Sequence, residues 1–215
     1  MNDQNLYHRL VGDRFLQAGD KAFLLTPGRE PLRYAELGEH CGRMQSRLHE
    51  LGVEPGDRII VQAEKSADAV ILYLACLRAG AIYIPLNTGY TPAEVEYFMG
   101  DAEPRVFVCD PSALESMTMV AENIGVPHIL TLDTQGGGSL MQGLDQLPSD
   151  SVVVARESDD LAAILYTSGT TGRSKGAMLT HHNLQSNAEV LIDYWQWKNE
   201  TDVLLHALPI FHVHG

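Results

Sequence analysis

Short apolar runs that alternate with helical patterns constrain the fold of this chain most strongly. Each run is wholly apolar, and the stretch after it repeats apolar residues every three or four positions. Parallel strands need crossover connections and are covered on both faces, so they read as continuous apolar runs. The pattern therefore predicts an α/β fold in which parallel-sheet layers are flanked by helices.

The individual elements follow from these patterns and from turn residues. The expected strands cover residues 59–61, 81–84, 106–108, 129–132, 161–165, 177–180 and 203–205. The expected helices cover residues 34–51, 70–80, 111–124 and 184–195, and another begins with Thr91 as its cap and Pro92 in its first turn. Gly136–Gly138 and residues 145–151 are predicted to form a surface loop, with a domain boundary as the alternative.

Composition and charge narrow the class of protein. The formal net charge of −13 opposes binding to nucleic-acid backbones and anionic lipid, so we expect neither as a partner. The first residues form no signal peptide, and the apolar stretches fall short of a membrane span. Cys41, Cys76 and Cys109 lack metal or redox spacing and are expected to be buried thiols in a reducing compartment. These features predict a cytoplasmic enzyme.

The segment from Tyr166 to Gly176 carries the clearest chemistry. It gathers hydroxyl residues, glycines and a lysine directly after an apolar strand. Glycines let backbone N–H groups approach a ligand, successive amides form an anion nest, and hydroxyls and lysine add donors. The segment is not a Walker A loop, because Ser174 stands before Lys175 where that motif requires glycine, and residues 177–180 continue as strand rather than helix. A polyphosphate-binding loop over 166–176 is the prediction, and a flexible loop is the alternative.

The letters YTSGTTGRSKG closely resemble the phosphate-binding signature of the adenylate-forming (AMP-binding) superfamily. Further resemblance comes from Leu32–Leu37, Leu77–Asn87 and Leu208–Gly215, in the order that the family has them. The ending Phe-His-Val-His-Gly favours the acyl-CoA synthetase branch. Ser174 departs from the usual proline of the signature but removes no donor.

The resemblance implies roles for the matching positions. It implies that the β- and γ-phosphates of ATP are held by Thr167, Ser168, Gly169, Thr170, Thr171, Gly172 and Lys175. Lys175 and His212 are the implied catalytic residues, and the Thr170 hydroxyl is the candidate ligand of Mg²⁺. Position alone would make His212 a packed loop histidine, whereas the resemblance places it beside the carboxylate. His181, His182 and His214 are expected to be structural.

The activity implied by the resemblance is an ATP-dependent acid–thiol ligation. A carboxylate attacks the α-phosphate of Mg-ATP, and coenzyme A then displaces AMP from the acyl-adenylate. Residues 1–215 are expected to be a truncated N-terminal adenylation domain without its C-terminal domain, inactive alone and with exposed apolar surface after residue 200. A peptide-synthetase domain, a carrier-protein-loading ligase and a non-catalytic nucleotide-binding module remain alternatives. The sequence does not specify the acid, and small dicarboxylates, fatty acids and aryl acids all stay open.

Overall fold

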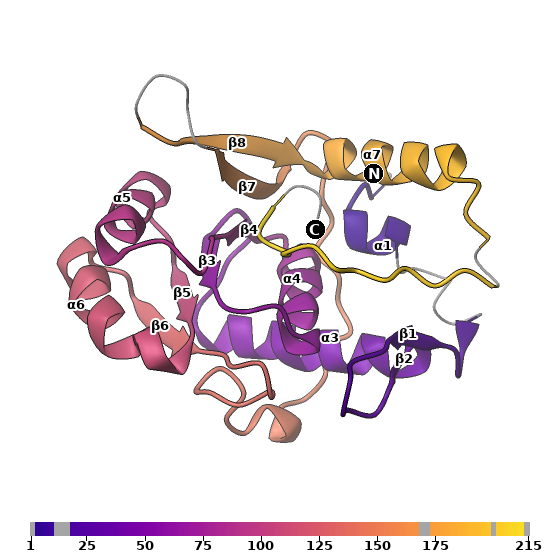
Figure 1. Ribbon diagram of the computed structural model, residues 1–215, viewed down its shortest axis with the longest axis horizontal. Coiled ribbons are helices and arrows are strands. Elements are labelled where there is room, and N and C mark those ends of the chain that lie inside the picture. Colours follow the sequence, from indigo (N-terminus) through magenta and orange to yellow (C-terminus); the bar gives the residue numbers. More distant parts are fainter. Residues whose placement is uncertain (1–2, 11–17, 168–172, 199–200, 213–215) are drawn as a thin grey trace.

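A single mixed sheet organises the protein. The computed structural model describes residues 3–10, 18–167, 173–198 and 201–212. In this part of the chain the sheet has the strand order β6 (His128–Thr131), β5 (Val106–Cys109), β3 (Arg58–Gln62), β4 (Ile82–Pro85), β7 (Leu161–Thr167) and β8 (Lys175–Thr180), and its neighbouring strands are parallel except β7 and β8 (Figure 1). Two further short strands form a separate antiparallel pair. The α/β fold predicted from the apolar runs is confirmed, with one antiparallel strand added at an edge.

The bounds of the elements match most of the predicted ranges. The strands are β1 (Ala22–Leu24), β2 (Leu32–Arg33), β3 (Arg58–Gln62), β4 (Ile82–Pro85), β5 (Val106–Cys109), β6 (His128–Thr131), β7 (Leu161–Thr167) and β8 (Lys175–Thr180). The helices are α1 (Leu6–Leu10), α3 (Tyr34–Glu50), α4 (Ala67–Ala79), α5 (Pro92–Ala102), α6 (Leu114–Ile124) and α7 (His181–Tyr194), with short 3₁₀ turns at Pro111–Ala113 and Leu144–Gln146. Within the described ranges, every helix is too short or too polar to span a bilayer.

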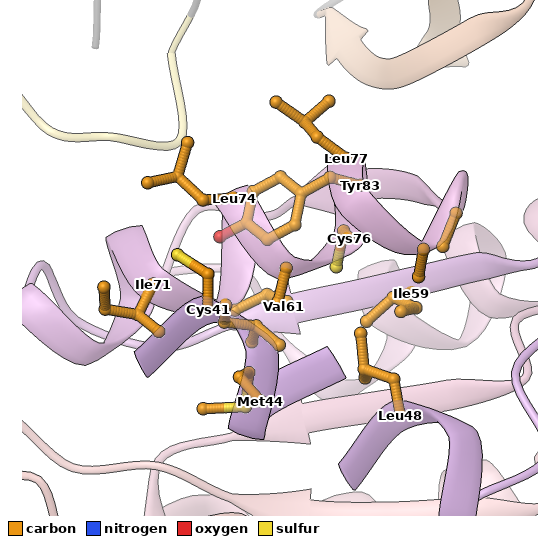
Figure 2. Close-up of a cluster of buried hydrophobic side chains, with 14 of the residues drawn as sticks. Cys41, Met44, Leu48, Ile59, Val61, Ile71, Leu74, Cys76, Leu77 and Tyr83 are labelled. Carbon is orange, nitrogen blue, oxygen red and sulfur yellow. The ribbon is translucent and has the colours of Figure 1, made fainter. Parts of the chain in front are cut away.

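The two faces of the sheet explain why the strands are apolar at every position. Successive strand residues point to opposite faces. Ile59 and Val61 pack with α3 and α4, whereas Ile60 between them packs with α5 and α6. Figure 2 shows the first of these clusters, where Met44 and Leu48 of α3 lie among the strand residues. Both faces are covered by helices. A polar side chain at any of these strand positions would therefore lose its hydrogen bonds to water, which would destabilise the fold.

The start of α5 is fixed by its own residues. The Thr91 hydroxyl accepts a hydrogen bond from the Glu94 amide at 3.4 Å, and the Glu94 carboxylate accepts one from the Thr91 amide at 2.8 Å. This reciprocal capping box satisfies two amides that the helix itself cannot pair. Pro92 occupies the first helical position, as predicted. The helix therefore starts at a defined point shortly after β4.

The segment predicted as a surface loop is tied to the helices beneath it. The Asp150 amide donates to the Gly42 carbonyl at 3.1 Å, and the Arg78 guanidinium donates to the Asp150 carbonyl at 2.6 Å. Arg78 is itself buried, and its guanidinium also donates to Oε1 of Gln45 at 2.9 Å, so its polar atoms are paired with protein acceptors. Residues 145–151 thus form a strap across α3 and α4 rather than a loose linker.

The strand predicted at residues 203–205 is wrong. The structure shows irregular backbone there, with Val203 and Leu205 exposed to 74% and 90%. Apolar, β-branched residues form a strand only where a neighbouring strand accepts their hydrogen bonds, and no described residue pairs with this segment. The exposed apolar surface expected after residue 200 is present, since Leu204 and Leu208 are also exposed.

His181 links α7 to α1. It is fully buried at the start of α7, and its Nδ1 accepts a hydrogen bond from the Leu6 amide of α1 at 3.0 Å. A ring nitrogen that accepts a hydrogen bond carries no proton, so this contact requires the neutral imidazole. Protonation of the ring would break the hydrogen bond. The expectation that His181 is structural is confirmed.

This contact predicts a pH dependence of stability. Burial first, and then the nearby Arg156, lower the pKa of His181 from 6.5 to about 4, against the smaller opposing effects of Asp160 and Asp3. The unfolded chain therefore binds more protons between these values, and the free energy of unfolding should fall as the pH drops from 6.5 towards 4, by about 2 kcal/mol. Urea unfolding across this range should show the loss, and His181→Asn should flatten it. An equally steep profile in His181→Asn, or a flattened one in the control His182→Asn, would contradict the assignment.

Candidate functional site

The segment predicted to hold phosphate lies at the tip of the hairpin formed by β7 and β8. Tyr166 pairs with Gly176 and Thr167 pairs with Lys175 in the antiparallel ladder. The predicted loop over 166–176 is therefore too long at both ends, because these four residues belong to the strands. The loop itself runs from Ser168 to Ser174. Ser168, Gly169, Thr170, Thr171 and Gly172 lie outside the described residues, and their predicted contacts with phosphate and Mg²⁺ stay predictions.

Thr167 and Lys175, two of the residues predicted to hold phosphate, lie at the mouth of this loop. Residues that face each other in an antiparallel pair carry their side chains on the same side of the sheet. Both residues are exposed, and the Thr167 hydroxyl lies 3.4 Å from the Lys175 carbonyl, to which it donates. Within the described part of the chain, the Lys175 ammonium makes no ion pair or hydrogen bond. The Thr167 hydroxyl and the Lys175 ammonium thus lie next to the loop, and the ammonium has no partner among the described residues.

Gly176 is required by the packing at the base of the hairpin. A Cβ at this position would lie 2.7 Å from Cγ2 of Ile164 and 3.4 Å from the ring of Tyr166. The absence of a side chain lets these neighbours close over the backbone directly after Lys175. The position of Lys175 is therefore defined by tight packing on its C-terminal side.

Tyr97 and Asp101 of α5 contact the same hairpin, which no sequence pattern predicted. The Tyr97 hydroxyl donates to the Ser174 carbonyl at 2.9 Å, and the Tyr166 hydroxyl donates to Asp101 Oδ2 at 2.6 Å. Burial, followed by the hydrogen bond to Asp101, raises the pKa of Tyr166, so its hydroxyl remains a donor. The four-residue spacing of Tyr97 and Asp101 marks a common helix face, but it does not reveal what that face contacts.

The last described segment, residues 201–212, contacts the loop that follows β3. The Lys65 ammonium, just after β3, donates to the carbonyls of His206 at 2.8 Å and Leu208 at 3.1 Å. A pocket of about 320 Å³ forms here between Lys65, Phe211 and their neighbours. Ligand sites of open α/β sheets lie beyond the carboxyl ends of the strands, which is where this pocket opens.

His212 directly follows Phe211, the last residue in the chain that lines this pocket. It is exposed, and its ring lies 4.7 Å from that of Phe211, which lines the pocket. Among the described residues, no contact joins His212 to Lys175, so the structure does not bring the two implied catalytic residues together. His182 is exposed at the start of α7, and His214 lies outside the described residues.

The cysteines and the acidic residues provide no alternative centre. Cys41, Cys76 and Cys109 are free and buried, and burial raises the pKa of Cys41 to about 12 and that of Cys109 to about 11. These values leave the thiols protonated and unreactive, as expected for packed cysteines. Among the residues described, no group of three or more histidines, cysteines or carboxylates is placed to hold a metal ion.

Comparison with known proteins gives the family. The sequence matches the AMP-binding enzyme family over residues 13–215. Apo MatB from Rhodopseudomonas palustris is 46% identical with a TM-score of 0.93, over 99% of this chain and 41% of that protein. ATP-bound MatB is 45% identical with a TM-score of 0.88, over 99% and 42%.

Two curated ligases are also similar. Oxalate–CoA ligase of Arabidopsis thaliana is 32% identical over 202 residues, which cover 91% of this chain and 39% of the relative. The mitochondrial malonate–CoA ligase ACSF3 of Homo sapiens is 32% identical over 212 residues, 95% of this chain and 35% of the relative. The chain thus spans less than half the length of the relatives it matches. With the family match extending over nearly all of its residues, this chain belongs to the AMP-binding enzymes.

Proposed function

We propose that these residues are the polyphosphate-binding part of an acid–thiol ligase that activates a carboxylic acid with ATP and transfers it to coenzyme A. The observation that carries the proposal is the exposed pair Thr167 and Lys175 at the mouth of a Gly/Ser/Thr-rich hairpin loop. Residues 1–215 would belong to one N-terminal adenylation domain, with further parts of the site supplied by sequence that the relatives have in addition.

The first step joins two anions, and this dictates what the protein must supply. A carboxylate oxygen attacks the α-phosphorus, the bond to the β-phosphate breaks, and pyrophosphate leaves with the electron pair. Donors aimed at the leaving group stabilise the charge that develops there. Lys175 suits this task, because it is exposed beside the loop and its charge has no partner within the described part of the chain. The Thr167 hydroxyl could join it by turning its proton from the Lys175 carbonyl to a phosphate oxygen.

Mg²⁺ would enter with ATP and screen the charge between the phosphates. Hard oxygen donors suit this ion, and the hydroxyl of Thr170 is the candidate protein ligand. His212 would donate to the carboxylate or to an α-phosphate oxygen and so reduce the repulsion between the reacting anions. Its exposed position next to Phe211, which lines the pocket near Lys65, is compatible with that role.

Short dicarboxylic acids are the first substrates to test. Relatives named for malonate and oxalate share 32% identity with this chain. Both acids keep a second carboxylate after the first is activated, so the site must hold a negative charge beside the reacting one. Fatty and aryl acids are the alternatives.

The test is ATP-dependent thioester formation by the protein that contains this chain. Purified protein is incubated with Mg-ATP, coenzyme A and, in turn, malonate, oxalate, a fatty acid or benzoate, while pyrophosphate and acyl-CoA are measured. We expect equimolar pyrophosphate and acyl-CoA with a dicarboxylate, and no turnover by the 215-residue chain alone. Pyrophosphate release without acyl-CoA, but with loading of a carrier protein, would favour the carrier-loading alternative. Absence of pyrophosphate with every acid would contradict the proposal.

A further inference from the structure

One side of α5 contacts both ends of the phosphate-binding hairpin. The Tyr97 hydroxyl donates to the Ser174 carbonyl, directly before β8. The Asp101 carboxylate accepts a hydrogen bond from the Tyr166 hydroxyl, near the end of β7. The two contacts are one helical turn apart on the same face of the helix. A single helix therefore contacts the hairpin both before the loop, at Tyr166, and at the end of the loop, at Ser174.

The helix is well suited to fix these positions. Its opposite face is buried through Val95, Phe98 and Met99, which belong to the core cluster on that side of the sheet. The Phe98 ring also packs against the Tyr166 ring, with centroids 4.4 Å apart. The capping box at Thr91 and this packing fix α5 relative to the sheet, and α5 in turn contacts the hairpin.

The hairpin needs such support because β8 lies at the edge of the sheet. In the described part of the chain β8 pairs only with β7, and its side chains are largely exposed. Among the described residues, Thr167 and Lys175 form the last pair of the ladder towards the loop. Tyr97 supplies a restraint there, through the Ser174 carbonyl and through its ring, which lies 5.6 Å from the Arg173 guanidinium.

We propose that Tyr97 and Asp101 are positioning residues for the phosphate-binding hairpin: they hold Ser174 and Tyr166, on its two strands, at the spacing at which Lys175 contacts a polyphosphate. They act through Ser174 and Tyr166 and touch no reacting atom. This role rests on the proposed function of the hairpin. It predicts that removing either contact weakens nucleotide binding although the donors themselves are intact.

The experiment compares conservative variants of the 215-residue chain. Tyr97→Phe removes only the hydroxyl, Asp101→Ala removes the acceptor, and Asp101→Asn keeps an acceptor oxygen for Tyr166. Glu96→Gln is the matched control, because Glu96 is an exposed carboxylate on the same helix that makes no contact with the hairpin among the described residues. Mg-ATP binding is measured by calorimetry, and amide hydrogen exchange is followed at residues 173–176.

We expect Tyr97→Phe and Asp101→Ala each to weaken Mg-ATP binding by about 3- to 10-fold, the range of one net hydrogen bond, and to speed exchange at residues 173–176. Asp101→Asn should recover most of the affinity, and Glu96→Gln should match the wild type. Wild-type affinity in both Tyr97→Phe and Asp101→Ala would overturn the inference, even with faster exchange, because the contacts would then be structural only. Failure of the proposed function looks different: Lys175→Ala would bind Mg-ATP as well as the wild type.

Discussion

Replacing Lys175 with alanine is expected to weaken Mg-ATP binding by about 10- to 100-fold, the range of a hydrogen bond to a charged group. The ammonium group is exposed beside the loop and has no other partner in the described part of the chain. Its loss therefore removes a phosphate contact without leaving a buried group unpaired. Stability should be unchanged within about 0.5 kcal/mol, as for other exposed side chains.

The controls separate a specific contact from general charge. Lys175→Arg keeps the charge but not the compact ammonium geometry, and should recover part of the affinity. Lys198→Ala removes one exposed positive charge beyond the end of α7 and should bind as the wild type. Calorimetric titration with Mg-ATP measures all three. Equal losses in Lys175→Ala and Lys198→Ala would mean that only the net charge matters, and the assignment of Lys175 would be wrong.

Replacing Gly42 with alanine should destabilise the protein by about 2 to 4 kcal/mol, although alanine is the better helix former. Gly42 lies in the middle of α3, where a Cβ would come within 2.6 Å of the Asp150 carbonyl oxygen and closer still to the Ser149 hydroxyl. The strap of residues 145–151 would have to move, and the Asp150 amide would lose its bond to the Gly42 carbonyl.

The same substitution elsewhere in α3 should have the opposite sign. Gly38 is exposed, and a Cβ there would meet nothing within 4 Å. Gly38→Ala should therefore raise the free energy of unfolding by about 0.5 to 1 kcal/mol. Urea unfolding monitored by circular dichroism measures both variants. A Gly42→Ala protein as stable as Gly38→Ala would show that the strap does not pack against the helix.

The core of the fold could be predicted from sequence because local and tertiary preferences agree there. The run Ile59-Ile60-Val61 is apolar at each position, and burial on both faces is what a central parallel strand requires. The end of α4 was equally readable, since Gly80 adopts a positive φ of 68° that favours glycine. Val203–Leu205 have the same strand-like composition but no neighbouring strand among the described residues, so composition alone misled.

For the candidate site, the sequence supplied the residue types, but it could not supply the tertiary contacts that hold them. The Gly/Ser/Thr-rich segment before Lys175 indicates anion binding from residue types alone, and Lys175 is exposed as that role requires. The ends of the loop were placed too far out, because Thr167 and Lys175 are compatible with either loop or strand. Tyr97 was missed because its contact with Ser174 joins residues 77 positions apart. Contacts at such separations depend on the tertiary fold and leave no local pattern.

The claim that the β7–β8 hairpin binds polyphosphate can be tested at the level of its own amides. Mg-ATP is titrated into the ¹⁵N-labelled chain, and backbone amide chemical shifts are followed throughout. We expect saturable shifts that cluster at Thr167 and at residues 173–176, with the amides of β6 unchanged. Saturable binding that leaves the hairpin amides at their original shifts, or shifts confined to the pocket near Lys65, would contradict it.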